Sequence, residues 1–119
     1  MSERILEFKV DKQLIQKMPG CDFSGIVAGS SGYLKAKFHF SEEWKDCVKV
    51  ASFGTVDIAS LAYSDYPIIL DKNDMCEIPS DVLVGQTFLV HVVGGKKPHY
   101  RINTNVLKVR QEVNINANS

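Results

Sequence analysis

The sequence has no net charge and no long hydrophobic run. Over 119 residues, 14 basic residues balance 14 acidic ones, which leaves a formal net charge of +0. Sequence-independent nucleic-acid binding needs a basic excess or a basic stripe, so the composition argues against that partner. No apolar stretch approaches the roughly 20 residues that cross a bilayer, and the charged start Met1–Phe8 is unlike a signal peptide. We therefore expect neither a nucleic-acid nor a membrane partner, and we expect synthesis in the cytoplasm.

Cysteine is scarce and irregularly placed. Cys21, Cys47 and Cys76 are an odd number at wide spacings, which fits neither a disulfide framework nor a C-x-x-C metal pattern. The sequence therefore predicts three free thiols and no metal site.

Side chains able to carry out catalysis are few and scattered. The only imidazoles belong to His39, His91 and His99, and no Ser-His-Asp order or H-E-x-x-H spacing accompanies them. His39 and His91 also fall inside predicted strands, where a structural role is the usual one. The sequence therefore predicts no catalytic residue and no cofactor, and the protein is not expected to be an enzyme.

Two short clusters carry a functional alternative beside a structural one. The carboxylates of Asp71, Asp74 and Glu77 could bind Ca²⁺, but they lack the D-x-[DN]-x-[DN]-G pattern of a calcium loop. Gly94–Lys97 resembles a phosphate loop but lacks the G-x-x-x-x-G-K-[ST] frame and a following helix. In both places we favour a hairpin turn, the first between strands at Tyr66–Leu70 and Met75–Ile78.

Alternating hydrophobicity is the main structural signal. In Tyr33–Phe40 every second residue is apolar, which is typical of a strand with one buried and one solvated face. Seven to nine short strands follow one another at spacings of about 8–12 residues, with single helical turns at Ser41–Trp44 and Pro79–Leu83. They predict one all-β domain over 1–119, ordered over about 4–113. We expect an antiparallel β-sandwich, Ig-like or jelly-roll-like. Its predicted core contains Leu34, Phe38, Phe40, Trp44, Leu70, Ile78, Phe88, Val90 and Val92.

The order of these segments resembles a known family. The segments that carry the resemblance are Leu6–Asp11, Tyr33–Trp44, Tyr66–Asp71, Cys76–Pro79, Val90–Gly95 and Ile102–Asn105. In this order they are similar to a small β-sandwich module of structural proteins of phages and prophages of Gram-positive bacteria. There the module often forms the N-terminus of baseplate, tail or fibre proteins. The resemblance covers about residues 4–113 and implies no catalytic residue.

The resemblance implies a virion protein that binds other phage structural proteins of the capsid or tail. Such modules usually continue into a linker, a helix or a receptor-binding region, whereas this sequence stops after its last strand; the Gly54–Ser64 region is also longer than expected. The first departure favours an accessory capsid decoration protein over a tail, baseplate or fibre module. A phage-encoded inhibitor of a host factor and a small-molecule-binding barrel are the competing classes, and self-association is left open.

The expected interface lies at loops and chain ends. Unpaired backbone and loose chain can be ordered by a neighbouring molecule. We expect the contact at an edge strand, at the ends Met1–Arg4 or Asn114–Ser119, or at the loop around Gly94–Pro98. The residues singled out are Gly94, Gly95, Lys96, Lys97, Pro98, Asn114 and Ile115.

Overall fold

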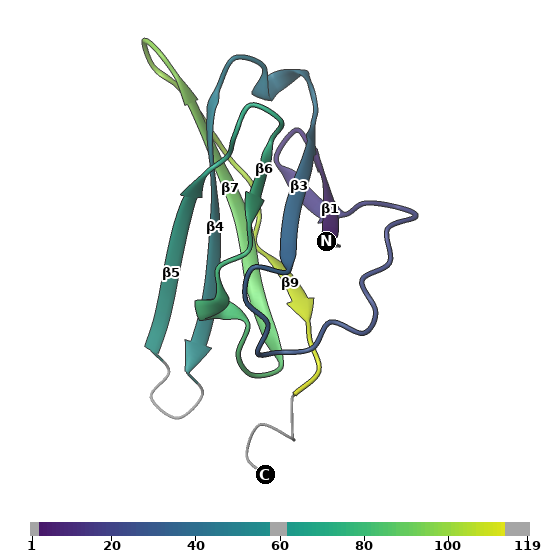
Figure 1. Ribbon diagram of the computed structural model, residues 1–119. Helices are drawn as coiled ribbons and strands as arrows, with labels where there is room; N and C mark the ends of the chain where they lie inside the picture. The colour runs from purple at the N-terminus through teal and green to yellow at the C-terminus, as the bar shows by residue number, and fades with distance from the viewer. Residues whose placement is uncertain (1–2, 58–61, 114–119) are drawn as a thin grey trace.

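The computed structural model describes residues 3–57 and 62–113, which form two β-sheets packed as a sandwich (Figure 1). The first sheet has the strand order β2 (Leu14–Lys17), β1 (Arg4–Asp11), β3 (Leu34–Phe40) and β6 (Met75–Glu77). The second has the order β5 (Ala62–Ile69), β4 (Val48–Asp57), β7 (Thr87–Lys96) and β8 (Tyr100–Asn103), with β9 (Leu107–Arg110) also on β7. Two 3-10 turns, η1 (Glu42–Trp44) and η2 (Ser80–Val82), are the only helical pieces in the described chain. The predicted all-β sandwich with one or two single-turn helices is confirmed.

The core lies between the sheets and consists of the residues that alternation predicts. The side chains of β3 alternate between buried and part-exposed, with Leu34, Ala36 and Phe38 inside. Phe38 stacks on Phe8 of the neighbouring strand at 5.1 Å between ring centroids. Of the nine predicted core residues, eight are buried, and Phe40 is partly buried against the same cluster.

One strand pair departs from the antiparallel expectation. β1 turns back into β2 as an antiparallel hairpin, yet it pairs with β3 in parallel, from Arg4 opposite Leu34 to Val10 opposite Phe40. A parallel pair needs a crossover rather than a tight turn. Here β2 and the irregular segment 18–33 form that crossover, and no local pattern marks it.

The turn at Asp71–Asp74 is not the predicted hairpin. β5 before it belongs to the second sheet and pairs with β4, whereas β6 after it belongs to the first sheet and pairs with β3. The turn itself forms as expected, since the Asp71 carboxylate accepts hydrogen bonds from the amides of Asn73 (2.8 Å) and Met75 (3.0 Å). The prediction was wrong because turn residues fix a local reversal, not the sheet that the next strand joins.

The predicted turn at Gly94–Lys97 is displaced along the chain. Gly94, Gly95 and Lys96 continue β7, and the exposed reversal falls at 97–99. Gly94 is buried under Trp44, because a Cβ placed on Gly94 would lie 2.8 Å from two ring carbons of the indole. The glycine therefore serves a close approach in a strand rather than a turn.

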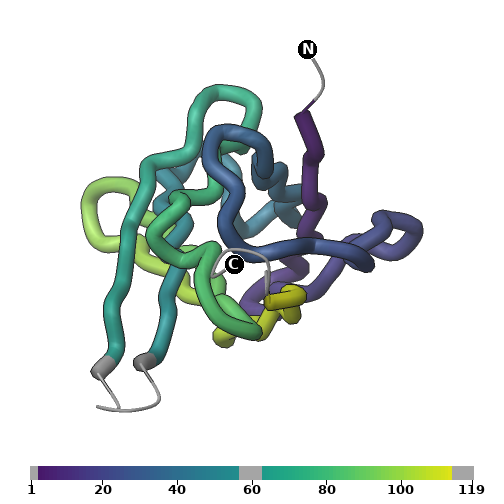
Figure 2. Tube along the Cα trace, turned by 60° about the horizontal axis from the view of Figure 1, so that its bottom comes forward, coloured from purple at the N-terminus to yellow at the C-terminus, as the bar shows by residue number. Residues whose placement is uncertain are grey.

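In the region Gly54–Ser64, which is longer than expected for a simple turn, the described residues Gly54–Asp57 and Ala62–Ser64 are the paired ends of β4 and β5. β4 pairs with β7 only as far as Gly54, but with β5 as far as Asp57. The end of this β4–β5 hairpin therefore extends beyond the rest of the sheet (Figure 2). From the sequence, Val56, Ile58 and Leu61 are candidate strand residues of this region; Val56 belongs to β4, and Ile58 and Leu61 lie outside the described residues.

Candidate interaction surface

The outer face of the second sheet carries apolar side chains where solvent-exposed strands usually carry polar ones. Ala51 and Phe53 of β4 point into the core, so their neighbours in sequence point outward. Cross-strand partners share a face, so the register defines the rest of this surface. The same register also places Asp65, His91 and Lys108 on this side of the sheet. We call its apolar part the apolar face; the residues of this part are Val48, Val50, Val56, Tyr63, Pro67, Ile69, Leu89 and Val93.

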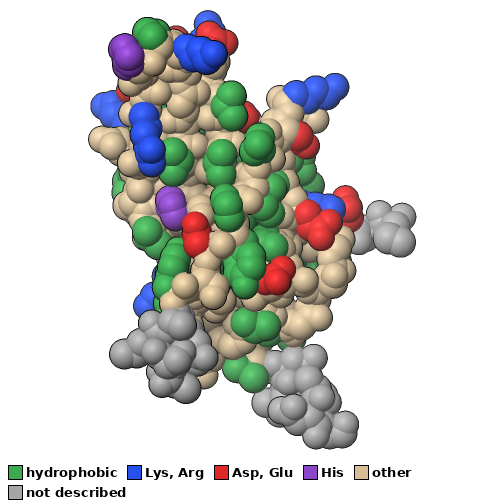
Figure 3. Space-filling model, turned by 90° about the vertical axis from the view of Figure 1, so that its left-hand side faces the viewer, with side chains coloured by type: hydrophobic (Ala, Val, Ile, Leu, Met, Phe, Trp, Pro, Cys, Tyr) green, Lys and Arg blue, Asp and Glu red, His purple; other side chains and the backbone are tan. Residues whose placement is uncertain are grey.

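Several side chains of the apolar face are strongly exposed. Ile69 is 69% exposed, Val48 64% and Tyr63 51%. Seen from the side that β5 forms, hydrophobic side chains gather in a band down the molecule with few charges among them (Figure 3). Contiguous apolar patches of this kind usually mark interaction sites in soluble proteins. This surface is therefore the strongest candidate site.

Two polar groups lie in the middle of this surface without partners. Ser52 and His91 are cross-strand neighbours on β4 and β7. The Ser52 hydroxyl and the His91 Nδ1 atom are both buried and make no hydrogen bond. Buried polar atoms without a partner are uncommon and costly.

The ring of Tyr63 covers part of the neighbouring strand on the apolar face. Its ring lies across β4 at Gly54, where a Cβ would come within 2.5 Å of the phenol oxygen. The Tyr63 hydroxyl donates to the Asp65 carboxylate at 3.1 Å. Partial burial, with the hydrogen bond and the charge of Asp65, raises the pKa of Tyr63. The phenol is therefore a neutral donor at physiological pH.

The apolar face continues into a groove of about 1010 Å³ at the end where the β4–β5 arm diverges. Val56 and Leu89 line it from the apolar face, and Val84 and Val113 line it from the opposite wall. The groove is open to solvent and extends the surface available to a docked partner.

The outer face of the first sheet is charged, and several of its charges are paired. Lys35 lies 3.2 Å from Glu77 and 3.3 Å from Glu3, and these two carboxylates raise the pKa of Lys35. His39 Nε2 lies 2.6 Å from the Glu7 carboxylate. Exposed pairs of this kind add little to stability. They do make this face hydrophilic, in contrast to the apolar face.

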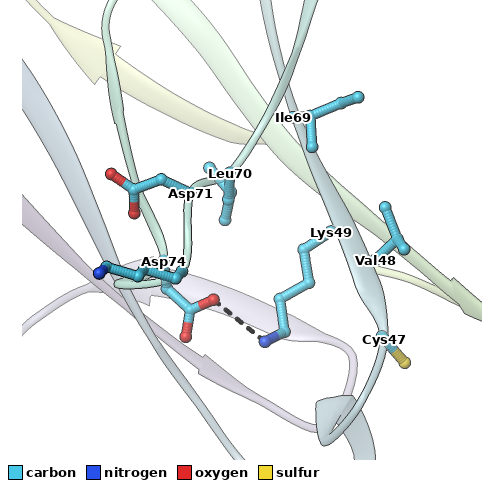
Figure 4. Close-up of a pocket in the computed structure, with 8 residues that line it drawn as sticks. Cys47, Val48, Lys49, Ile69, Leu70, Asp71 and Asp74 are labelled. Atoms are coloured by element: carbon cyan, nitrogen blue, oxygen red, sulfur yellow. Dashed lines mark hydrogen bonds and ion pairs between the residues drawn. The ribbon is translucent and has the colours of Figure 1, made fainter.

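The carboxylates once considered for Ca²⁺ do not converge on one point. Asp71 binds turn amides, and Glu77 pairs with Lys35. Asp74 accepts from Lys49 at 3.0 Å, at a shallow pocket between the sheets (Figure 4). In that view Lys49 points toward Asp74. Within residues 3–57 and 62–113, no three His, Cys, Asp or Glu side chains are grouped so as to hold a metal ion.

The predicted loop interface is only partly a loop. Gly94 and Gly95 lie inside β7, and the Lys96 amine donates to the carbonyl of Lys45 at 3.1 Å. Lys97 and Pro98 lie in the exposed turn, whereas Asn114 and Ile115 fall outside the described residues. As an interface, this set stays a prediction. The three cysteines are free, as predicted.

Comparisons of the chain with protein-family models, with curated proteins and with solved structures found no match. No helix in the described part of the chain is long and apolar enough to cross a membrane.

Sequence reasoning missed the apolar face, although a signal was present. In the stretch from Val48 to Phe53, apolar residues occupy both parities of the strand, as they do in Tyr66–Leu70. Strands apolar on both sides are typical of sheets covered on both faces. Here the second side has no cover among the described residues, which is the sign of a docking surface.

Proposed function

We propose that the protein is a non-enzymatic binding module that docks through its apolar face onto a larger assembly. The observation that carries this proposal is the exposed apolar face itself, with Ile69 and Val48 at its most exposed end. Burying an exposed apolar surface is favourable by about 25 cal/mol per Å². A partner of matching shape therefore gains a driving force that the charged face does not offer.

The resemblance described above suggests which assembly this is. We propose an accessory protein of a phage virion, with capsid decoration as the first choice and a tail, baseplate or fibre component as the second. Many copies on a lattice make weak individual contacts effective through multivalency. A net charge of +0 leaves little repulsion between neighbouring copies.

An inhibitor that binds a host protein is the alternative from another class. An apolar face can serve such a protein equally well, so location rather than surface chemistry separates the two. Quantitative mass spectrometry of purified particles tests this. Hundreds of copies per particle support capsid decoration, and a few to some tens support a tail or baseplate position. Absence from the particle overturns both virion assignments.

The docking surface is tested with two variants, each of which introduces one positive charge on a different face of the molecule. We expect Ile69→Lys to weaken attachment about tenfold, because a charge would have to be desolvated in the interface. Ile5→Lys is the matched control, since Ile5 is also exposed but lies on the charged face. The measurement is the number of copies that remain on particles assembled with each variant. Equal loss from both variants, or from neither, would exclude the apolar face as the docking surface.

A further inference from the structure

Strand β5 leaves one edge of the second sheet open. Within the described residues it pairs only with β4, and it is the outermost strand on its side of the molecule (Figure 1). The other edge strands are short: β6 has three residues, and β2, β8 and β9 have four each. β5 has eight residues and carries neither lysine nor arginine. Natural edge strands are usually protected by shortness, charge or proline. β5 is long, and its only protection of this kind is one carboxylate, Asp65, and one proline, Pro67.

The hydrogen bonds to β4 fix which backbone groups point outward. The Leu70 amide donates to the Lys49 carbonyl at 2.9 Å, and these two residues continue the β4–β5 register. Residues alternate between bonding and non-bonding pairs along an antiparallel ladder. The amides and carbonyls of Tyr63, Asp65, Pro67 and Ile69 therefore face the open edge, except that proline has no N–H. This is the edge position in which proline is tolerated.

We propose that β5 pairs antiparallel with β5 of a second copy of this chain, about a two-fold axis at Tyr66. In this register Tyr63 lies opposite Ile69 of the second copy, and the two exchange a pair of hydrogen bonds. The amide of Asp65 donates to the Pro67 carbonyl of the second copy. The second sheets of the two copies then form one continuous sheet, and their two apolar faces join into one surface. This inference does not rest on the proposed function.

The neighbouring registers fit less well. An axis at Asp65 would set two carboxylates directly opposite each other, which is unfavourable. An axis at Pro67 would oppose two residues that lack an N–H, so no bond would form at the centre. An axis at Ser64 would also put each Asp65 amide opposite a carbonyl, but the two strands would overlap only over 62–66. The Tyr66 register keeps the carboxylates diagonal and overlaps the strands over 63–69, the longest of these pairings that meets both conditions.

Proline substitution tests whether the outward backbone groups of β5 bond to a second copy. Sedimentation equilibrium of the purified protein, from micromolar to millimolar concentration, should show a weak monomer–dimer equilibrium. Asp65→Pro removes an outward N–H without touching the bonds to β4, and we expect the dissociation constant to rise about tenfold. Asp65→Asn is the matched control, because it keeps the N–H. Pro67→Val restores a missing N–H and should tighten the dimer about tenfold.

Disulfide cross-linking of cysteines introduced one at a time in β5 tests the register of the proposed dimer. Opposed residues in a non-bonding pair are close enough for a disulfide, so Tyr66→Cys should give a covalent dimer on mild oxidation. Ile68→Cys, which faces Ser64 rather than itself, should not, and the native thiols are common to both variants. Cross-linking through Asp65→Cys or Pro67→Cys instead would overturn the register. A monomeric wild type and a monomeric Pro67→Val, or equal dimerisation of Asp65→Pro and Asp65→Asn, would overturn the proposal.

Discussion

At the scale of single residues, Gly94 shows how one missing Cβ supports the core. Trp44 is fully buried, and its indole N–H donates to the Lys12 carbonyl at 2.7 Å. That bond fixes the ring from one end while the backbone of Gly94 lies against its flat side. With both contacts in place, the indole ring has no space to shift away from Gly94.

Gly94→Ala should therefore lower the free energy of unfolding by about 1–3 kcal/mol, because the added methyl group overlaps the indole ring. Gly95→Ala is the matched control in the same strand. There a Cβ would meet only the Tyr100 carbonyl oxygen at 3.5 Å, an ordinary contact. Urea denaturation of both variants gives the comparison. Equal stability of the two variants would contradict the close packing of Trp44 on Gly94.

The environment of Cys76 disfavours the ionised form of its thiol. Burial, with the nearby charges of Asp71 and Glu77, raises the pKa of Cys76 to about 12 from 9.0. Since the thiolate is the nucleophile, at pH 8 we expect alkylation about a thousandfold slower than for a thiol of ordinary pKa. Intact-mass measurement over time shows this, with three additions under denaturing conditions as the control. Rapid reaction of Cys76 in the folded protein would contradict it.

The same shift fixes the sign of a pH effect. The folded state holds the Cys76 proton more tightly than the unfolded chain does. Stability from this group is therefore present below pH 9 and falls as the pH rises from about 9 toward 12. Cys76→Ser should remove this alkaline slope, which a series of denaturation curves can measure.

At the scale of elements, one polar side chain adds to the apolar packing that holds η2 in place. The Gln111 amide donates to the carbonyls of Val82 (3.1 Å) and Val84 (3.0 Å), and the residue is buried. It therefore ties the turn and the segment after it to the end of β9.

Gln111→Ala should cost about 2–4 kcal/mol in unfolding free energy, because both carbonyls lose their donor and a cavity remains. Glu112→Ala, at the exposed next position, should stay within about 0.5 kcal/mol of wild type. Thermal unfolding followed by circular dichroism checks both. If the two variants melt together, the Gln111 amide is not what holds this turn.

Elements also show what the sequence could and could not predict. Alternation in Tyr33–Phe40 was enough to predict β3, its buried face and much of the core. The partner of β6 was not predictable, because Asp71–Asp74 has the composition of a turn whether the next strand pairs locally or crosses to the other sheet. The parallel pairing of β1 with β3 likewise depends on residues far apart in the chain. The interface predicted around Gly94–Pro98 stays a prediction. The apolar face was not predicted, because it depends on how β4 pairs with β5 and β7.

At the scale of the whole molecule, the sandwich has two unlike sides. The first sheet presents paired charges such as Lys35 with Glu77, and the second presents the apolar face. In the docking proposed above, the apolar face meets the partner and the charged side stays toward solvent. The elongated shape, 53 × 36 × 22 Å, gives the apolar face a long axis along which contacts can spread.

The crossing at Asp71–Asp74 has a further consequence, for the way the protein unfolds. The chain leaves the second sheet after β5, adds β6 to the first, and returns as β7. Neither sheet is thus a continuous stretch of chain, and each buries its inner face against the other in one core, so we expect the two to unfold together. Fluorescence of Trp44, packed on β7, and circular dichroism of both sheets should therefore report a single coincident transition. We therefore expect the alternation of the chain between the two sheets to make unfolding of the domain cooperative.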